Sequence, residues 1–472
     1  MTSLNVSFVI NALKSQGVSY ELNQKSYVDA DIASVHIDSR RVKPGSLFVA
    51  FSGQHVDGHD YISKAKANGA VVALVNHYVN DEILQIKVDQ ADIALAQLAN
   101  AYRKTLSARI IAITGSAGKT TTKEMLSALL ADHYVESTDG NFNNELGVPL
   151  TLLNFSTEAK FGIVEMGAGQ LGDIAYLMGI AEPDISLITN IGDAHIGRFG
   201  SRDNIAMAKT EIFSALGSDK LAIVNCDDNY SALFETRASH CEVLTFSSSE
   251  QTAAVKMAID RCDLNGSSVS VFYQDQHVSI DLPLYAEHQL MNFLAATTVA
   301  IACGLPLTEI KVAAEKIILQ GDRQSVLTRN PDITVIDDSY NASPTAVIKA
   351  VEYLAEYKKD KKSLNLALVL GEMAELGDYS QHYHEKIAAH IAEHQIDKVF
   401  LCGNATRFCL DILQNTDALL IQADAVEQLI PKVLQHLSPN DTVLVKGSRS
   451  QHLEKMVNAL LEHDFSENTQ CY

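Results

Sequence analysis

Short runs of almost wholly apolar residues alternate with amphipathic segments along most of this chain. In its middle part the apolar runs lie at residues 109–114, 161–166, 185–190 and 221–225. The segment 120–131, which follows the first run, has apolar residues at helical spacing. Strands that are apolar throughout are covered on both faces, so this pattern predicts a parallel α/β sheet.

A second alternation of the same kind occupies the C-terminal third and predicts a Rossmann-like domain. The N-terminal hundred residues carry shorter strands and two helices, and residues 243–283 predict a small antiparallel excursion before a helix at 287–303. We therefore expect three α/β domains, at 1–107, 108–322 and 323–472. The remaining predicted strands are 46–51, 70–75, 333–336, 366–370, 398–402, 418–421 and 442–445, and the helices are 61–69, 91–105, 345–357, 382–393, 426–436 and 451–463.

Composition and charge narrow the class of protein. Asp and Glu number 58 against 37 Lys and Arg, a net charge of −21, and no basic run interrupts this acidity. Such a chain repels nucleic acid and anionic membranes, although a local site can still hold an anionic small molecule. No run reaches membrane-spanning length, the N-terminus lacks the features of a signal peptide, and the 7 cysteines are scattered. We expect a cytoplasmic monomer that neither binds nucleic acid nor inserts into a membrane.

The strongest local motif is the glycine-rich segment GSAGKTT, which follows one predicted strand and opens a helix. Glycines let the backbone close around phosphates, and a helix N-terminus supplies unpaired N–H groups. Lys119 can reach the β- and γ-phosphates of a nucleotide, and the Thr120 hydroxyl can bind Mg²⁺. Ile113 stands where the usual phosphate loop has its first glycine, and a glycine-rich turn without nucleotide remains the alternative. The predicted ATP-binding residues are Gly115, Ser116, Ala117, Gly118, Lys119, Thr120 and Thr121.

This shortened loop, followed by Lys123-Glu124-Met125, resembles the ATP site of the Mur ligases, three-domain enzymes that extend the peptidoglycan precursor. The resemblance implies a uridine-nucleotide domain, a central P-loop ATPase domain and a C-terminal Rossmann-like domain. It covers essentially the whole chain, through Asp38-Ser39-Arg40, Asp57-Gly58-His59, Asn141–Asn144, Val164–Ala168, the region 190–195 and the segment 208–213.

Motifs near the C-terminus narrow the resemblance further. The stretches DDSYNA at 337–342, GEMAELG at 371–377 and KGSRS at 446–450 are similar to those of family members that add D-alanyl-D-alanine to UDP-N-acetylmuramoyl-tripeptide. This implies an ATP-dependent amide ligase that works through an acyl phosphate. The implied cofactors are ATP, two Mg²⁺ ions and carbon dioxide held as a lysine carbamate.

The predicted catalytic residues are Lys119, Glu165, His195 and Lys209. Glu165 and His195 lie at or just after the ends of successive predicted strands, so their side chains can converge at the carboxyl edge of a parallel sheet. An ammonium beside Mg²⁺ is repulsive, whereas a carbamate has two oxygens and a negative charge that suit a hard cation. The resemblance therefore implies Thr120, Glu165, His195 and carbamylated Lys209 as metal ligands, with a solvated helical lysine as the alternative for Lys209.

The resemblance implies further contacts in each domain. Ser39 and Arg40 are expected to bind the uridine nucleotide, and plain turn chemistry is the alternative for both. Other histidines, such as His382 and His384, fall on a polar helix and are read as solvated. The expected contacts for ATP are Asn292, Arg323 and Asp338, and those for the dipeptide are Tyr340 and Asn341.

Two other functions remain open from the sequence. One is a ligase of the same family that adds a different amino acid, for which residues 337–342 are the discriminating stretch. The other is a regulator that uses ATP as a switch, which would leave Glu165, His195 and Lys209 without a role.

Overall fold

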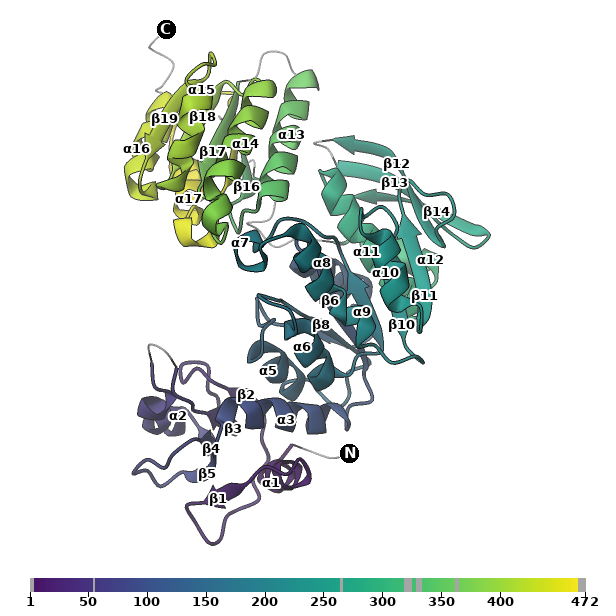
Figure 1. Cartoon of the computed structure of the whole chain (residues 1–472), viewed down its shortest axis with the longest axis vertical. Helices are drawn as coiled ribbons and strands as arrows, with labels where there is room; N and C mark the ends of the chain where they lie inside the picture. Colours follow the sequence, from purple (N-terminus) through teal and green to yellow (C-terminus); the bar gives the residue numbers. More distant parts are fainter. Residues whose placement is uncertain are drawn as a thin grey trace.

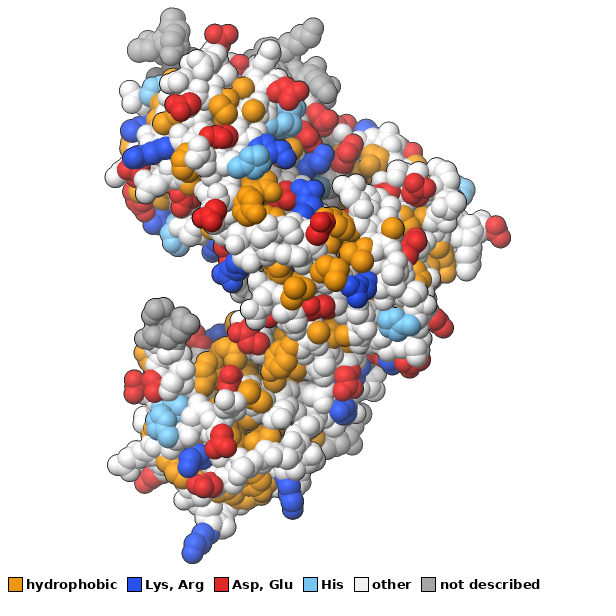
Figure 2. Space-filling model, in the orientation of Figure 1, with side chains coloured by type: hydrophobic (Ala, Val, Ile, Leu, Met, Phe, Trp, Pro, Cys, Tyr) orange, Lys and Arg blue, Asp and Glu red, His pale blue; other side chains and the backbone are white. Residues whose placement is uncertain are grey.

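The computed structural model describes residues 4–53, 56–263, 266–317, 325–327, 333–360 and 365–465, with 325–327 and 357–360 as backbone only. Three sheets follow one another along the chain, and each is covered by helices (Figure 1). The predicted α/β class with three domains is confirmed. The space-filling view is hollowed on one side, between the N-terminal and C-terminal ends of the molecule (Figure 2). Arg323 lies outside the described residues.

The N-terminal sheet has five strands in the order β1-β5-β4-β3-β2. Strand β1 runs antiparallel to β5, and the other neighbours are parallel. The element bounds are α1 Val6–Ser15, β1 Tyr20–Leu22, β2 Ser34–His36, β3 Ser46–Val49, η1 Gly58–Tyr61, α2 Ile62–Ala67, β4 Ala70–Val75, β5 Leu84–Val88 and α3 Ala91–Arg103.

The central sheet has nine strands in the order β14-β13-β12-β11-β10-β9-β6-β8-β7. Strand β6 lies between β8 and β9 and is parallel to both, so the three loops that follow these strands meet at one edge. The bounds are β6 Arg109–Thr114, α4 Lys119–Leu129, β7 Val135–Ser137, α5 Gly147–Leu153, β8 Phe161–Glu165, α6 Asp173–Ala181, β9 Ile185–Ile188, α7 Ile196–Phe199, α8 Arg202–Lys209, α9 Glu211–Ser214, β10 Leu221–Asn225, α10 Ser231–Ala238, β11 Glu242–Ser247, β12 Val255–Asp263, β13 Gly266–Tyr273, β14 Gln276–Leu282, α11 Glu287–Ala302 and α12 Leu307–Ala314.

The prediction of a separate antiparallel excursion over 243–283 is wrong for its first strand. Strand β11 pairs parallel with β10, and only the β12–β13 and β13–β14 pairs are antiparallel. All these strands belong to the central sheet. The first residues of β11, Glu242 and Val243, are exposed, so this strand lacks the continuous apolar run that marks a buried parallel strand.

The C-terminal sheet has six strands in the order β15-β16-β20-β17-β18-β19, parallel except for β15. The bounds are β15 Ser325–Leu327, β16 Thr334–Asp338, α13 Pro344–Asp360, β17 Leu366–Gly371, η2 Gly377–Tyr379, α14 Ser380–Glu393, β18 Lys398–Cys402, η3 Ala405–Cys409, α15 Leu410–Leu413, β19 Leu419–Ala423, α16 Val426–His436, β20 Thr442–Lys446, η4 Arg449–Gln451 and α17 Glu454–Glu462.

The prediction that His384 is solvated is wrong. His384 is fully buried on the inner face of α14, where burial lowers the pKa of its imidazole. Its Nε2 accepts a hydrogen bond from Met373 N (3.3 Å), and its Nδ1 donates to Ser380 O (2.7 Å). His384 therefore stabilises the loop that follows β17. Its neighbours in the sequence are mostly polar, so the sequence pattern did not indicate that His384 faces inward.

The N-terminal and central domains are joined by a side chain that imitates a strand. Asn154, which follows α5, donates to Val35 O (3.0 Å) and accepts from Val35 N (3.0 Å) on the edge strand β2. Its carboxamide satisfies both backbone groups, as a neighbouring strand would. Tyr102 on α3 adds a hydrogen bond to Phe155 O (3.0 Å).

No helix within the described ranges is long and apolar enough to cross a membrane.

Candidate active site

A cleft of about 1500 Å³ opens at the carboxyl edge of the central sheet. Its walls are the loops after β6, β8 and β9, the start of α11, and the C-terminal segments around Asp338 and Glu375. All predicted catalytic side chains line this cleft, namely Lys119, Glu165, His195 and Lys209. The convergence expected from the parallel sheet is therefore present.

The glycine-rich loop is held in one conformation by close neighbours. Gly118 caps α4 with φ +79°, a left-handed conformation that side chains disfavour. Lys119 Nζ donates to Gly115 O (2.8 Å) across the loop. The Asn190 carboxamide accepts from Ala117 N (3.1 Å) and donates to Ala117 O (3.0 Å), so it fixes the loop from the side of β9.

An oxygen-rich pair lies beside this loop. The Thr120 hydroxyl donates to Glu165 Oε2 (2.7 Å), and Asn143 Nδ2 donates to Glu165 Oε1 (2.7 Å). The Glu165 residue is only 2% exposed. A buried carboxylate and a hydroxyl from the first turn of a phosphate-loop helix are the ligand types that Mg²⁺ prefers, so these residues fit a magnesium ion. Lys123 fixes the loop that carries Asn143, because its buried ammonium donates to Thr138 O (2.6 Å).

His195 and Lys209 flank the cleft from α7 and α8. His195 caps α7 with φ +61°, and its Nδ1 lies against the Glu375 carboxylate of the C-terminal domain. Lys209 ends α8 and is 1% exposed. Burial, and then the nearby charge of Lys119, hold the pKa of Lys209 well below its usual value. This chemistry favours a neutral amine at Lys209.

The C-terminal wall of the cleft is built around Lys446, a buried cation at the end of β20. Its ammonium donates to Asp338 Oδ2 (2.8 Å) and to Asn341 O (2.9 Å). The Tyr340 ring lies beneath the Arg449 guanidinium, whose carbon is 5.7 Å from the ring centroid. These contacts fix the turn after β16, and Asp338, Tyr340 and Asn341 on this turn line the cleft.

Comparison with known protein families decides the identity. Residues 31–103 match the Mur ligase family catalytic domain, 113–300 the Mur ligase middle domain, and 322–449 the Mur ligase glutamate ligase domain. The chain belongs to the Mur ligase family. This confirms the resemblance that the sequence motifs indicated.

This Mur ligase is similar in sequence to named enzymes and similar in structure to solved proteins of the same family. The UDP-N-acetylmuramoyl-tripeptide–D-alanyl-D-alanine ligase of Escherichia coli is 32% identical over 92% of this chain and 95% of its own length. The enzyme of the same name from Bacillus subtilis is 31% identical over 94% and 96%. A crystal structure of MurF from Acinetobacter baumannii matches with a TM-score of 0.87 and 29% identity, over 98% of this chain and 100% of the other. MurF from Thermotoga maritima in complex with ADP matches with a TM-score of 0.79 and 27% identity, over 91% and 97%.

Ser39 and Arg40, the expected uridine contacts of this Mur ligase, lie in the N-terminal domain and do not line the central cleft. Ser39 is buried, whereas the Arg40 side chain is 78% exposed and paired with Asp38 on its own turn. The neighbouring Arg41 instead forms an ion pair with Asp139 of the central domain. Arg41 therefore makes one solvent-exposed link between the two domains.

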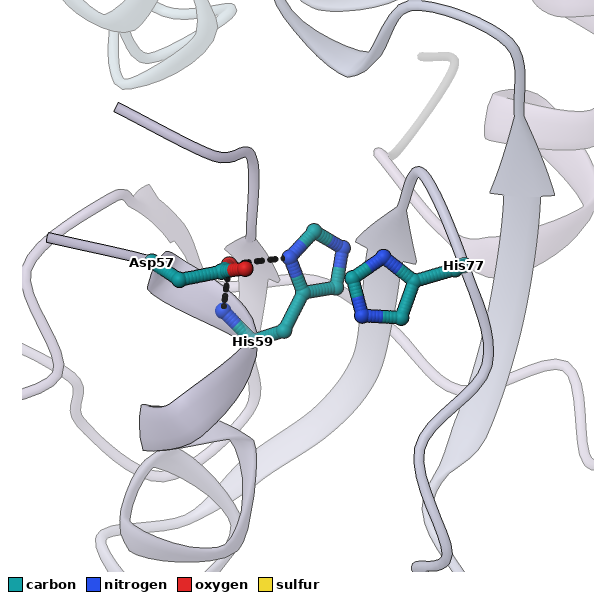
Figure 3. Close-up of side chains that lie close together, drawn as sticks. All are labelled: Asp57, His59 and His77. Atoms are coloured by element: carbon teal, nitrogen blue, oxygen red, sulfur yellow. Dashed lines mark hydrogen bonds and ion pairs between the residues drawn. The ribbon is translucent and has the colours of Figure 1, made fainter. Parts of the chain in front are cut away.

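A cluster of Asp57, His59 and His77 braces the N-terminal domain (Figure 3). His59 Nδ1 donates to Asp57 Oδ1 (2.5 Å), His59 Nε2 accepts from Asn76 N (3.0 Å), and His77 stacks on His59 at 3.8 Å. The backbone and side-chain N–H groups of His59 lower the pKa of Asp57 to about 2. Both ring nitrogens of His59 are occupied by protein groups, so the cluster ties η1 to the end of β4 and leaves no lone pair of His59 for a cation.

Sequence reasoning did not assign roles to Asn143, Asn190 or Glu375. All three lie within motifs that carried the resemblance, at 141–144, 190–195 and 371–377. Their roles depend on which backbone or side chain they meet, and a carboxamide or an exposed carboxylate has no composition signal of its own. Asn292 lies against Gly118, where an added Cβ on the glycine would be 2.2 Å from Asn292 Oδ1.

The substitution Gly118→Ala is expected to raise the KM for ATP about tenfold or more, since the left-handed strain of roughly 1–2 kcal/mol is joined by the contact with Asn292. Steady-state kinetics with varied ATP measures this change. Gly17→Ala is the matched control, because Gly17 also has a left-handed φ (+73°) but has open space around it. An unchanged KM in Gly118→Ala would contradict the account of the loop.

Proposed function

We infer that this Mur ligase joins D-alanyl-D-alanine to UDP-N-acetylmuramoyl-tripeptide during peptidoglycan synthesis, with conversion of ATP to ADP and phosphate. One observation carries the choice of substrates. Relatives that align along more than nine tenths of this chain, C-terminal domain included, have the name of that ligase. If the chain used a different amino acid, we would expect its relatives to be ligases named for that amino acid.

The reaction has two chemical steps. A carboxylate oxygen of the tripeptide attacks the γ-phosphorus of ATP, and ADP leaves, which produces an acyl phosphate. The dipeptide amine then attacks the acyl carbon, and phosphate departs as the amide forms. Each pair of unit negative charges at 4 Å costs about 4 kcal/mol at an effective dielectric constant near 20, so the site must hold positive charge in advance.

The side chains of the cleft supply and organise that charge. Lys119 is the cation of the loop, and reaching the phosphates requires it to leave Gly115 O. Thr120 and Glu165 would hold one Mg²⁺, while Glu165, His195 and a carbamate on Lys209 would hold a second. These two ions, when bound, neutralise the phosphate and carboxylate oxygens that must approach each other.

Carbamylation of Lys209 is part of this proposal. The nitrogen lone pair of the neutral amine attacks the carbon of carbon dioxide and an N–C bond forms. One C=O π bond opens, which places its electron pair on oxygen, and the nitrogen loses a proton to water. The burial of Lys209 supports this step, because only the unprotonated amine is a nucleophile and the site disfavours the ammonium. A carbamate exchanges a cation that repels Mg²⁺ for an anion that attracts it.

The remaining assignments extend the proposal to the other domains. We place the domain boundaries at 1–107, 108–322 and 323–472, and we take the protein to be a cytoplasmic monomer. Binding of the uridine nucleotide is assigned to Ser39 and Arg40, of ATP to residues 115–121 with Asn292, Arg323 and Asp338, and of the dipeptide to Tyr340 and Asn341.

A phosphate-release assay tests the proposed function. Purified protein with ATP, Mg²⁺ and UDP-N-acetylmuramoyl-tripeptide is expected to release phosphate in quantity only after D-alanyl-D-alanine is added. Phosphate release that ignores both substrates would support an ATP switch instead. Release with another amino acid, and none with the dipeptide, would identify a different ligase of the family.

A further inference from the structure

The C-terminal domain touches the central domain on the turn that carries His195. This turn is α7, which lies beside the C-terminal domain in Figure 1 and packs against η2. Gly197 N donates to Glu375 O (3.1 Å), and the Tyr379 hydroxyl donates to Gly200 O (2.7 Å). The docking surface of α7 is therefore the backbone next to a predicted metal ligand.

Gly197 on α7 lies against Gly377 of the C-terminal domain, and the absence of a side chain on Gly197 allows the backbones to meet this closely. A Cβ added to Gly197 would lie 2.6 Å from Gly377 N and 2.7 Å from Glu375 O. Gly197 lies inside a helical turn, a backbone conformation that alanine adopts readily. The approach of the other domain, rather than local conformation, thus requires glycine at position 197.

Glu375 reaches across this contact to two residues of the same turn. Its Oε2 pairs with His195 Nδ1, and its Oε1 pairs with Arg198 Nη2 at 2.9 Å. His195 and Glu375 both have φ +61°, a left-handed conformation that costs roughly 1–2 kcal/mol for a residue with a side chain. Such strain persists where the surrounding structure imposes it, often at functional sites.

We propose that Glu375 is a positioning residue that orients His195 as a metal ligand, so that the C-terminal domain completes the metal site only when it is docked on α7. This inference rests on the metal site in the proposed function. Glu375 occupies Nδ1 of His195, which leaves Nε2 as the nitrogen for a cation. Histidines that bind metals commonly donate their other N–H to a carboxylate, which fixes the ring and raises its basicity. A more basic imidazole is a better partner for Mg²⁺, a hard cation that otherwise prefers oxygen.

The consequence is a coupling between metal binding and domain docking. If the docked domain increases the affinity of His195 for the metal, the bound metal must favour docking by the same factor. The acyl phosphate would then form in a site that is closed over it. Water, which would hydrolyse this intermediate, is excluded at the moment when the metal site is complete.

Mn²⁺ is the probe that tests this proposal. It is titrated into the full-length protein in the presence of saturating ADP, and the free ion is measured by electron paramagnetic resonance. We expect Glu375→Gln to raise the Kd of Mn²⁺ about 10–100-fold, the usual effect of losing such a carboxylate. Gly197→Ala is expected to raise it in the same range, although both side chains of the His195–Glu375 pair remain.

Tyr379→Phe is the matched control at the same interface. It removes the hydrogen bond to Gly200 without touching His195, so the Kd is expected to stay within about threefold of wild type. Thermal melting of each variant reports whether the fold is intact.

Several results would overturn the proposal. Wild-type affinity in Glu375→Gln refutes the positioning role, and wild-type affinity in Gly197→Ala refutes the coupling to docking. An equal loss in Tyr379→Phe would indicate general loosening and would also refute the positioning role. If the Mn²⁺ results are as expected but the wild-type protein does not ligate, the proposed function fails while the positioning role stands.

Discussion

Replacement of Lys209 by alanine is expected to lower kcat for ligation by about 10²–10³-fold, the usual effect of removing one preorganised electrostatic group. Lys209 is 1% exposed and lines the cleft with Glu165 and His195. A carbamate there would provide negative oxygens to a metal, and alanine provides neither charge nor ligand. A small carboxylate such as acetate or formate supplies the negative oxygens that alanine lacks, so we expect it to restore part of the activity.

The carbamate itself can be observed directly. Wild-type protein equilibrated with ¹³C-bicarbonate is expected to show a carbamate carbon in its NMR spectrum, and Lys209→Ala is expected to lack it. Removal of carbon dioxide from the buffer should reduce activity reversibly. Full activity without carbon dioxide, together with no rescue of Lys209→Ala by carboxylates, would contradict the carbamate and leave a structural lysine.

Glu165→Gln is expected to lower kcat by a similar factor, about 10²–10³-fold, and to raise the Mg²⁺ concentration needed for half-maximal rate. Gln has almost the same shape and can still accept from the Thr120 hydroxyl, so the fold should survive. What is lost is the negative charge of a side chain that is almost fully buried beside the phosphate loop. Rates measured across a Mg²⁺ titration separate this effect from a change in substrate binding.

Asn143→Ala provides the control for Glu165→Gln. It removes the hydrogen bond of 2.7 Å to Glu165 Oε1 but keeps the carboxylate charge. A hydrogen bond to a charged group contributes about 1.5–3 kcal/mol. Because the charge of Glu165 is retained, we expect the rate to fall about tenfold, less than in Glu165→Gln. If Asn143→Ala and Glu165→Gln reduced kcat equally, this would contradict the claim that Glu165 acts in catalysis through its negative charge.

Strands that are buried on both faces could be predicted well from the sequence. Strands β6, β10 and β18 have the predicted bounds, because each is apolar along almost its whole length. Strands β1 and β2 were not predicted, because each has only three residues and is half-buried. Such a segment is too short to show either the alternating pattern of a half-buried strand or the continuous apolar run of a buried one. The position of α14 was predicted within two residues, but not that His384 faces inward.

The predictable part of the site was the part that topology dictates. The loops after adjacent parallel strands meet at one edge, and Thr120 and Glu165 do lie in hydrogen-bonding contact there. Contacts between domains follow no such rule, because neither hydrophobic periodicity nor strand order indicates which residues of two domains will meet. The pairing of His195 with Glu375 across 180 positions was therefore beyond prediction, although each residue lay in a recognised motif.

The central claim is that ATP phosphorylates a carboxylate of the tripeptide before the amide forms. Its most direct test is the reaction of UDP-N-acetylmuramoyl-tripeptide labelled with ¹⁸O in its terminal carboxylate, with ATP and D-alanyl-D-alanine in ordinary water. The account predicts that each released phosphate carries one oxygen from the carboxylate, which mass spectrometry detects. Unlabelled phosphate, accompanied by amide product or not, would contradict it.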